Sequence, residues 1–307
     1  MTGAIAFGYD SQTDKSNATA SGLGMDDAEI NFAISEDIEG LGKLAAKLGF
    51  GSGGRGDTAT GNDSTISLTT ASGIAITGGT TKGSSYLTQG IASAGTAYQW
   101  DLSGKLFSKR TINDAISVKV PVADGVSVSV AHSEAAVSSY WTGTGATGNG
   151  TEQRYNTLSV DYSAGPLAIN AGYRAYDNGL ESGTTTLRSA SSDVRNRAAL
   201  SYDLGLAKIG AGYEQTKYKY GNKKTDSLLG INVPLGGALN VGAQVAQSST
   251  TDNASSSDNQ DRNGYLLVAN YNLSKRTYLV ANYYQYSAGD SYSTRPSGYG
   301  VFLYNNF

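Results

Sequence analysis

The sequence predicts an all-β protein, a transmembrane antiparallel β-barrel of sixteen strands. Three observations carry this prediction: apolar and polar residues alternate in short segments, short and long connections alternate between the segments, and the chain ends in Phe307. In 299–307, Tyr, Val, Leu, Asn and Phe occupy alternate positions, which is the period of a strand with one apolar face. A barrel wall needs apolar residues only on its lipid face, because its lumen is wet.

The strand-like segments follow one another along the whole chain. Taken in order they are 3–9, 28–35, 41–50, 65–70, 74–80, 113–120, 126–133, 155–162, 167–176, 195–204, 206–216, 227–235, 239–247, 264–271, 277–286 and 298–307. Their number is even, as a closed antiparallel barrel demands. No segment approaches the roughly 18 apolar residues that a membrane helix requires.

The connections between these segments differ in length on the two sides. Short ones lie at 71–73, 123–125, 164–166, 204–205, 236–237 and 272–276, and long ones at 81–112, 134–154, 177–194, 248–261 and 287–296. Short periplasmic turns and long extracellular loops are typical of outer-membrane barrels. Since strand signals resume after every loop, we expect 1–307 to form a single barrel without a domain boundary.

The composition agrees with a barrel and argues against other classes of protein. Charged residues make up 16% and hydrophobic residues 39% of the chain, which suits a wall with one apolar and one wet face. The chain has no Cys, so we expect neither a disulfide framework nor a thiolate metal site. The formal charge of −3 gives no reason to expect a nucleic-acid partner. Because Met1 leads directly into an alternating segment, we interpret the chain as mature, without its export signal.

Four stretches resemble a known family. They are the turn Asn272-Leu273-Ser274-Lys275-Arg276-Thr277 before a Tyr-rich strand, the acidic turn that follows Ser35, the strand from Asn113 to Pro121, and the turn from Pro234 to Gly237. Together they cover the chain end to end, and the first is the most specific. They resemble the trimeric general porins of Gram-negative outer membranes, most closely the branch that includes anion-selective porins.

The resemblance implies a water-filled channel in the bacterial outer membrane for passive diffusion of small hydrophilic solutes and ions. It also implies a homotrimer in contact with lipid and lipopolysaccharide, and a third long loop folded into the lumen as a constriction. By position that loop spans about 81–109 and contains Lys82, Tyr86 and Lys105. Its length agrees independently, since it is the longest gap between strand signals.

The chain departs from the family at inner-wall positions where family members carry arginine. Glu29 stands in the second strand, Gly79-Thr80 replaces a Gly-Arg pair after Ile76, and Tyr304 replaces an arginine of the last strand. The family's set of inner arginines therefore does not transfer as a whole.

The charges expected to face the lumen indicate its ion preference. If the apolar residues face outward, Lys43, Lys47, Lys119, Arg174, Arg195 and Arg197 point inward, opposed by Glu29, Asp161, Asp203 and Glu214. A narrow passage of low dielectric focuses such fields. Since 81–100 holds Lys82 and no Asp or Glu, we expect weak anion preference. The alternative is that the basic residues only bridge to the lumen acids or to loops.

Catalysis and metal binding have little support in the sequence. The single His, His132, lies near Ser129 and Ser133, but serine catalysis also needs an orienting acid that converges on the histidine. We therefore predict no enzyme and no cofactor. Oxygen ligands at 10–14 and 252–261 could bind Ca²⁺, but their spacing matches no known loop and a calcium site is not predicted.

Tyrosines crowd the last three strands and leave two further functions open. Most of Tyr271, Tyr283, Tyr284, Tyr286, Tyr299 and Tyr304 should form the interfacial girdle at headgroup depth. A stacked track along the lumen would instead indicate a substrate-specific channel for a sugar or organic anion. A third reading is an adhesive or structural barrel with a plugged lumen. Pore diameter and preferred solute depend on how 81–109 folds.

Overall fold

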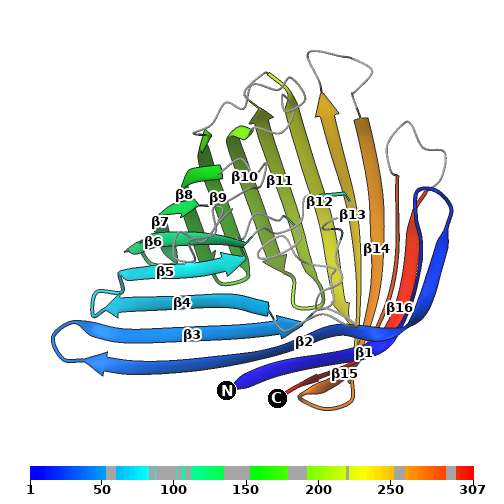
Figure 1. Ribbon diagram of the computed structural model, residues 1–307, viewed down its shortest axis with the longest axis horizontal. Coiled ribbons are helices and arrows are strands. Elements are labelled where there is room, and N and C mark those ends of the chain that lie inside the picture. The colour runs from blue at the N-terminus through cyan, green and yellow to red at the C-terminus, as the bar shows by residue number, and fades with distance from the viewer. Residues whose placement is uncertain are drawn as a thin grey trace, which may run out of the picture.

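The computed structural model describes residues 1–52, 60–82, 87, 102, 106–107, 112–134, 153–178, 192–218, 221–251, 260–287 and 295–307. These residues form a closed antiparallel barrel in which each strand pairs with its neighbours in sequence and the first strand pairs with the last (Figure 1). No helix among the described residues is long and apolar enough to cross a bilayer.

The predicted sixteen-stranded barrel is confirmed. The strands are β1 (Thr2–Thr13), β2 (Thr19–Ile38), β3 (Gly42–Ser52), β4 (Thr60–Thr70), β5 (Ala75–Lys82), β6 (Ile112–Ala123), β7 (Val126–Glu134), β8 (Gln153–Ala164), β9 (Leu167–Asn178), β10 (Ser192–Asp203), β11 (Lys208–Tyr218), β12 (Lys223–Pro234), β13 (Leu239–Thr251), β14 (Gln260–Asn272), β15 (Thr277–Tyr286) and β16 (Ser297–Asn306). Most strands extend beyond the predicted segments, because backbone pairing continues where the apolar alternation has ended.

The barrel closes between its two ends. The Gly3 amide donates to the Phe307 carbonyl at 2.8 Å, and the Phe307 amide donates to the Gly3 carbonyl at 2.9 Å. The two termini therefore lie side by side at the end of the barrel that carries the short turns (Figure 1). This closure leaves no free sheet edge for pairing with another chain.

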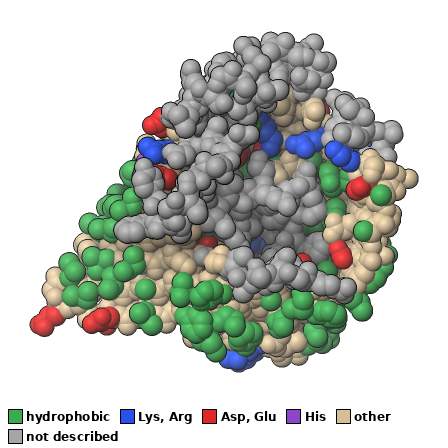
Figure 2. Space-filling view, in the orientation of Figure 1, with side chains coloured by type: hydrophobic (Ala, Val, Ile, Leu, Met, Phe, Trp, Pro, Cys, Tyr) green, Lys and Arg blue, Asp and Glu red, His purple; other side chains and the backbone are tan. Residues whose placement is uncertain are grey.

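Side chains alternate between the outer surface and the interior of the barrel. Phe7, Leu267 and Val301 are 51%, 49% and 52% exposed, whereas their neighbours Ala6, Leu266 and Phe302 are 0%, 0% and 4% exposed. Directly opposed residues of paired strands share a face, so the register assigns every strand position to one side. Hydrophobic side chains cover much of the outer surface along β2–β5 (Figure 2).

An apolar cluster lies on the inner side of the last strands. Leu228, Leu266, Val280, Tyr284 and Phe302 pack there. Residues Leu102, Leu106 and Phe107, from the connection between β5 and β6, join this cluster. The Arg262 Nη2 of β14 also donates to the Leu106 carbonyl at 3.3 Å. These residues of the connection therefore contact the wall of β14.

The remainder of the predicted constriction loop lies outside the described residues. Of 83–111, only Leu87, Leu102, Leu106 and Phe107 are described. Tyr86 and Lys105 fall outside them, as does the side chain of Lys82 at the end of β5. The inward path of 81–109 as a whole stays a prediction.

Candidate functional site, an arginine pair on the inner wall

Two arginines lie directly opposite each other on the inner wall. Arg174 of β9 pairs with Arg195 of β10 in the register. Each is flanked by a threonine on the next strand, Thr157 of β8 beside Arg174 and Thr216 of β11 beside Arg195. The Nε of Arg174 donates to the Thr157 Oγ1, and the Nε of Arg195 donates to the Thr216 Oγ1, both at 3.1 Å. Each threonine therefore holds one guanidinium group from the side that faces away from the other arginine.

This arrangement is unfavourable for stability. Like charges directly opposite each other on paired strands are destabilising. Local departures from such a rule are expected mainly at functional or strained sites, which makes this position a candidate site. An anion that binds between the two guanidinium groups would relieve their repulsion.

Two tyrosines support the arginines through their ring faces. The Arg174 Cζ lies 4.0 Å from the ring centre of Tyr155 and 5.9 Å from that of Tyr176. The Arg195 Cζ lies 5.7 Å from the ring centre of Tyr176. A guanidinium over an aromatic face is attracted by the ring quadrupole, and the attraction is stronger where water is excluded.

Acidic residues balance part of this charge. Arg197 of β10, Glu214 of β11 and Asp226 of β12 follow one another across the register. The Glu214 Oε1 lies 3.4 Å from the Arg195 Nε, and the Asp226 Oδ2 lies 3.0 Å from the Lys224 Nζ. Arg174, by contrast, forms no ion pair with any carboxylate in the described part of the chain.

The site opens as a recess of about 100 Å³ on the inner wall. Its lining comes from four consecutive strands, β8 to β11: Thr157, Ser159, Asn170, Gly172, Arg174, Arg195, Arg197 and Glu214. We name Arg174, Arg195 and Arg197 the arginine patch. Hydroxyl, amide and guanidinium donors dominate the recess, so its chemistry suits a small anion.

The structure brings together three of the predicted site residues, which are those of the arginine patch. Lys43, Lys47 and Glu29 occupy inner positions of β2 and β3. Lys119 of β6 lies 3.5 Å from the Asp161 carboxylate of β8. These four residues do not line the recess, and the contribution of each predicted residue to selectivity stays a prediction.

Sequence reasoning missed charged residues just beyond the apolar alternation. Lys224 and Asp226 precede the predicted segment 227–235, and Arg262 precedes the predicted segment 264–271. All three occupy inner positions of β12 or β14, which begin earlier than predicted. The polar run 223–226 carries no apolar residue that could have signalled a strand.

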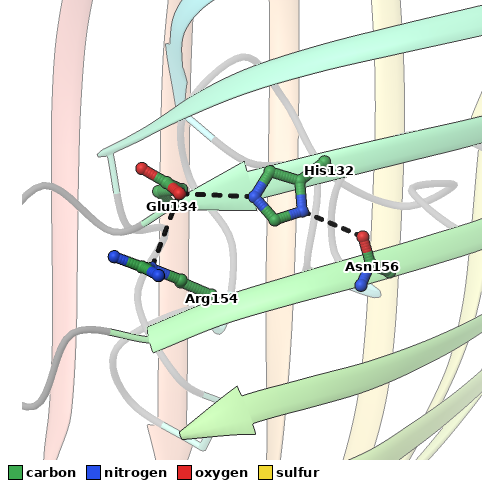
Figure 3. A network of polar contacts seen from close by, with 4 residues as sticks. All are labelled: His132, Glu134, Arg154 and Asn156. Atoms are coloured by element: carbon green, nitrogen blue, oxygen red, sulfur yellow. Dashed lines mark hydrogen bonds and ion pairs between the residues drawn. The ribbon is translucent and has the colours of Figure 1, made fainter. Parts of the chain in front are cut away.

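The single histidine lies on the opposite face of the wall. His132 Nδ1 is 2.9 Å from the Asn156 side chain, and its Nε2 is 3.4 Å from Glu134, which lies 3.5 Å from Arg154 (Figure 3). His132 and Asn156 are directly opposed on β7 and β8, at positions that alternate with Ser129 and Ser133. The histidine therefore points away from both serines, against the serine-hydrolase alternative.

The tyrosines of the last strands divide between the two faces. Tyr271, Tyr283 and Tyr299 are exposed on the outer surface, where a girdle is expected. Tyr284 and Tyr304 face inward but are almost fully buried. Buried rings offer no stacking surface to a passing sugar, so Tyr284 and Tyr304 do not contribute to a sugar track.

A metal site has no support in the part of the chain that the structure describes. Within it, no group of three or more His, Cys, Asp or Glu side chains is placed to hold a metal ion.

Several solved porin structures have the same fold. The chain is similar to an anion-selective porin from Comamonas acidovorans, with 20% identity, a TM-score of 0.73, and coverage of 100% of this chain and 98% of that one. It is similar to the trimer form of OmpT, an outer membrane protein of Vibrio cholerae, with 13% identity, a TM-score of 0.72, and coverage of 100% and 98%. A mutant porin of Rh. blastica gives 14% identity, a TM-score of 0.65, and coverage of 100% and 99%.

Sequence comparison identifies the family. Curated protein sequences give no significant match to this chain. The family model of the Gram-negative porins, however, matches residues 1–291. That match covers fifteen complete strands of the closed barrel and the whole arginine patch. The chain therefore belongs to the Gram-negative porin family and forms a channel of the bacterial outer membrane for passive diffusion of small hydrophilic solutes.

Proposed function

We propose that the channel has a weak preference for anions and that the arginine patch is its source. The observation that carries this proposal is the direct opposition of Arg174 and Arg195 on the inner wall. Glu214 lies close to Arg195 and directly opposite Arg197, and Asp226 lies close to Lys224, while Arg174 has no ion-pair partner among the described residues. A positive group on a narrow lumen wall raises the local concentration of anions.

The preference is weak because the rest of the wall is mixed. Lys119 is paired with Asp161, and Glu29 and Asp27 occupy inner positions of β2. The structural neighbour from Comamonas acidovorans is described as anion-selective, which agrees with the proposed sign. We further infer that 1–307 is one domain and that 81–109 narrows the lumen, with Lys82, Tyr86 and Lys105 near the constriction.

The test is a zero-current potential across a planar bilayer that separates two KCl concentrations. The wild-type channel should give a potential of the sign set by chloride. Arg174→Gln and Arg195→Gln should each move it toward zero, because each removes one positive charge from the patch. Arg276→Gln is the matched control, since Arg276 lies in the exposed turn between β14 and β15. A wild-type potential of the sign set by potassium would reject the proposal.

The second candidate is a channel that is specific for an organic anion. The recess of about 100 Å³, with arginine, amide and hydroxyl donors together, is the observation in its favour. Such a site would fill, so conductance would saturate as the salt of that anion is raised. A general pore would give conductance that rises linearly with concentration.

We propose that the chain forms a homotrimer through the outer surface of β2–β5. The six strands β2–β7 contain no Tyr or Trp, whereas outward tyrosines lie on β1, β8–β11 and β14–β16. Because the Tyr and Trp residues of interfacial girdles mark contact with lipid headgroups, six neighbouring strands without them suit contact with another protein. OmpT of Vibrio cholerae, a structural neighbour, is described in a trimer form.

Two matched substitutions test the trimer. Ile66 of β4 and Leu229 of β12 are outward and similarly exposed, at 54% and 56%. Ile66→Lys should abolish the trimer on native gels, since it puts a charge into the subunit contact. Leu229→Lys should keep it, although a charge on the lipid face costs about 2–4 kcal/mol at the bilayer midplane. Equal loss in both variants would contradict the assignment.

We propose lipid and lipopolysaccharide as the partners of the remaining outer wall. The outward tyrosines Tyr173, Tyr202, Tyr213, Tyr283 and Tyr299 support this assignment. We also expect no enzymatic activity, since His132 and the nearby serines lie on opposite faces of β7.

A further inference from the structure

We propose that Tyr155 and Thr157 of β8 are positioning residues that hold the Arg174 guanidinium at the lumen and so set the ion preference. The inference rests on the proposed anion preference and names the residues through which Arg174 acts. Tyr155 and Thr157 are two positions apart on one face of β8. They contact different parts of the same side chain of β9.

The two contacts engage different parts of the Arg174 guanidinium group: Tyr155 covers its face and Thr157 binds its edge. The Tyr155 ring, whose residue is only 4% exposed, lies 4.0 Å from the Arg174 Cζ and covers one face. The Thr157 Oγ1 takes the hydrogen bond from Nε at 3.1 Å. The terminal Nη groups make no hydrogen bond or ion pair with any side chain within the described ranges. Within the described part of the chain, these N–H groups are available for a passing anion.

The register explains why Tyr155 is within reach. Tyr155 pairs directly with Tyr176, and Thr157 pairs directly with Arg174. Arg174 is therefore the diagonal neighbour of Tyr155, a spacing that long and aromatic side chains bridge. The two rings lie 5.3 Å apart between centres. Arg174 is thus held toward the end of the barrel that carries the long loops.

Without these contacts the arginine would lose its orientation. An arginine side chain has many rotamers, so it needs fixed neighbours to keep one direction. Glu214 lines the same recess and offers an alternative carboxylate partner. An Arg174 that turned to Glu214 would neutralise it and leave a smaller positive field on the wall. The tyrosine and the threonine therefore act on selectivity through Arg174.

The experiment measures the chloride-to-potassium permeability ratio of single channels in planar bilayers. Tyr155→Leu removes the ring but keeps apolar bulk, and Thr157→Val removes the hydroxyl at nearly constant volume. Each should lower the ratio by roughly half or more of the change caused by Arg174→Gln, because the cation–π contact or the hydrogen bond is lost. Tyr155→Phe keeps the ring and should retain the wild-type ratio. Tyr173→Leu is the matched control, since Tyr173 lies on the outer surface beside Arg174.

A double substitution separates positioning from general damage to the wall. In a channel that already carries Arg174→Gln, Tyr155→Leu should cause no further change in the permeability ratio. An additional change of the same size as in the wild-type background would overturn the inference, because Tyr155 would then act independently of Arg174.

The outcomes distinguish this inference from the proposed function. A wild-type channel without anion preference defeats the proposed function, and the positioning role with it. If Arg174→Gln lowers the ratio while both Tyr155→Leu and Thr157→Val leave it unchanged, only the positioning role is wrong. Thr157→Val alone decides the question if Tyr155→Leu does not insert as a folded channel.

Discussion

Tyr304 and Asp26 form a partly buried contact between the last strand and the second. The Tyr304 hydroxyl donates to the Asp26 carboxylate, and the Tyr304 ring stacks flat on Tyr278 with 5.2 Å between ring centres. Asp26 is the extra residue of a bulge, since Ala6 pairs with Asp27 and Phe7 pairs with Met25. A bulge redirects a side chain and sharpens the local twist. Here it brings a carboxylate to a tyrosine that is 0% exposed.

Tyr304→Phe should lower the stability of the barrel. The substitution keeps the ring stack and removes the hydroxyl, so the loss is that of one hydrogen bond to a charged group. We expect the free energy of unfolding to fall by about 1.5–3 kcal/mol, measured by urea titration of the detergent-folded protein. Tyr271→Phe, on the exposed outer surface, is the control and should change little. Equal stability of the two variants would show that the contact contributes nothing.

Asp14 holds the turn between β1 and β2 and makes it sensitive to acid. Its Oδ1 accepts hydrogen bonds from the Ser16 hydroxyl at 2.7 Å, the Ala18 amide at 2.9 Å and the Ser16 amide at 2.8 Å. The hydrogen bond from the Ser16 hydroxyl has the largest effect and that from the Ala18 amide adds to it, so the pKa of Asp14 lies below its ordinary value of 3.8. A lowered pKa means that the ionised carboxylate favours the folded turn.

The turn should therefore be fully formed above pH 3.8 and open as the pH falls through the lower, folded-state pKa of Asp14. Protection factors for exchange of the Ser16 and Ala18 amide hydrogens report this opening. Asp14→Asn should remove the pH dependence, because the amide does not titrate. Loss of protection already at neutral pH would be at odds with the assigned role of the carboxylate.

Among the structural elements, β5 carries a glycine that its pairing requires. Gly79 has a φ of +147°, a conformation that side chains rarely adopt, and a Cβ there would lie 2.1 Å from the Ser64 carbonyl oxygen of β4. The neighbouring Gly78 has room, since its Cβ would lie 4.0 Å from the nearest atom, the Ala115 carbonyl oxygen. Two adjacent glycines thus differ in what they tolerate.

Gly79→Ala should destabilise the barrel, with Gly78→Ala as its matched control. Backbone strain of this kind costs about 1–3 kcal/mol, and the contact with Ser64 adds to it. The fraction of chain that refolds to a heat-resistant barrel on gels should fall for Gly79→Ala and stay near wild type for Gly78→Ala. A reversed order would contradict the pairing of β4 with β5.

The strand boundaries show what the sequence can and cannot predict for an element. Apolar alternation marks the part of a strand that crosses the lipid, and those segments were predicted. The pairing of β1 and β2 continues to Thr13 and Thr19, where polar residues and glycines give no period-two signal. The missed Lys224 and Asp226 have the same cause.

For the whole molecule, closure and strand number follow from the alternation, but the neighbours of a side chain do not. Because side chains alternate between the two faces of a strand, the position of each residue within its strand was enough to predict that Arg174, Arg195 and Arg197 share one face. The direct opposition of Arg174 and Arg195 depends on the register between β9 and β10, which the connection at 179–191 leaves undetermined in the sequence. Register also brings Tyr155 under Arg174.

The central claim is that the closed barrel is an open, water-filled channel whose inner arginines favour anions. The most direct test is a recording of purified protein in a planar bilayer with a KCl gradient. We predict discrete conductance steps that grow linearly with salt, and a zero-current potential of the sign set by chloride. The absence of conductance steps, or a potential of the sign set by potassium, would contradict this account.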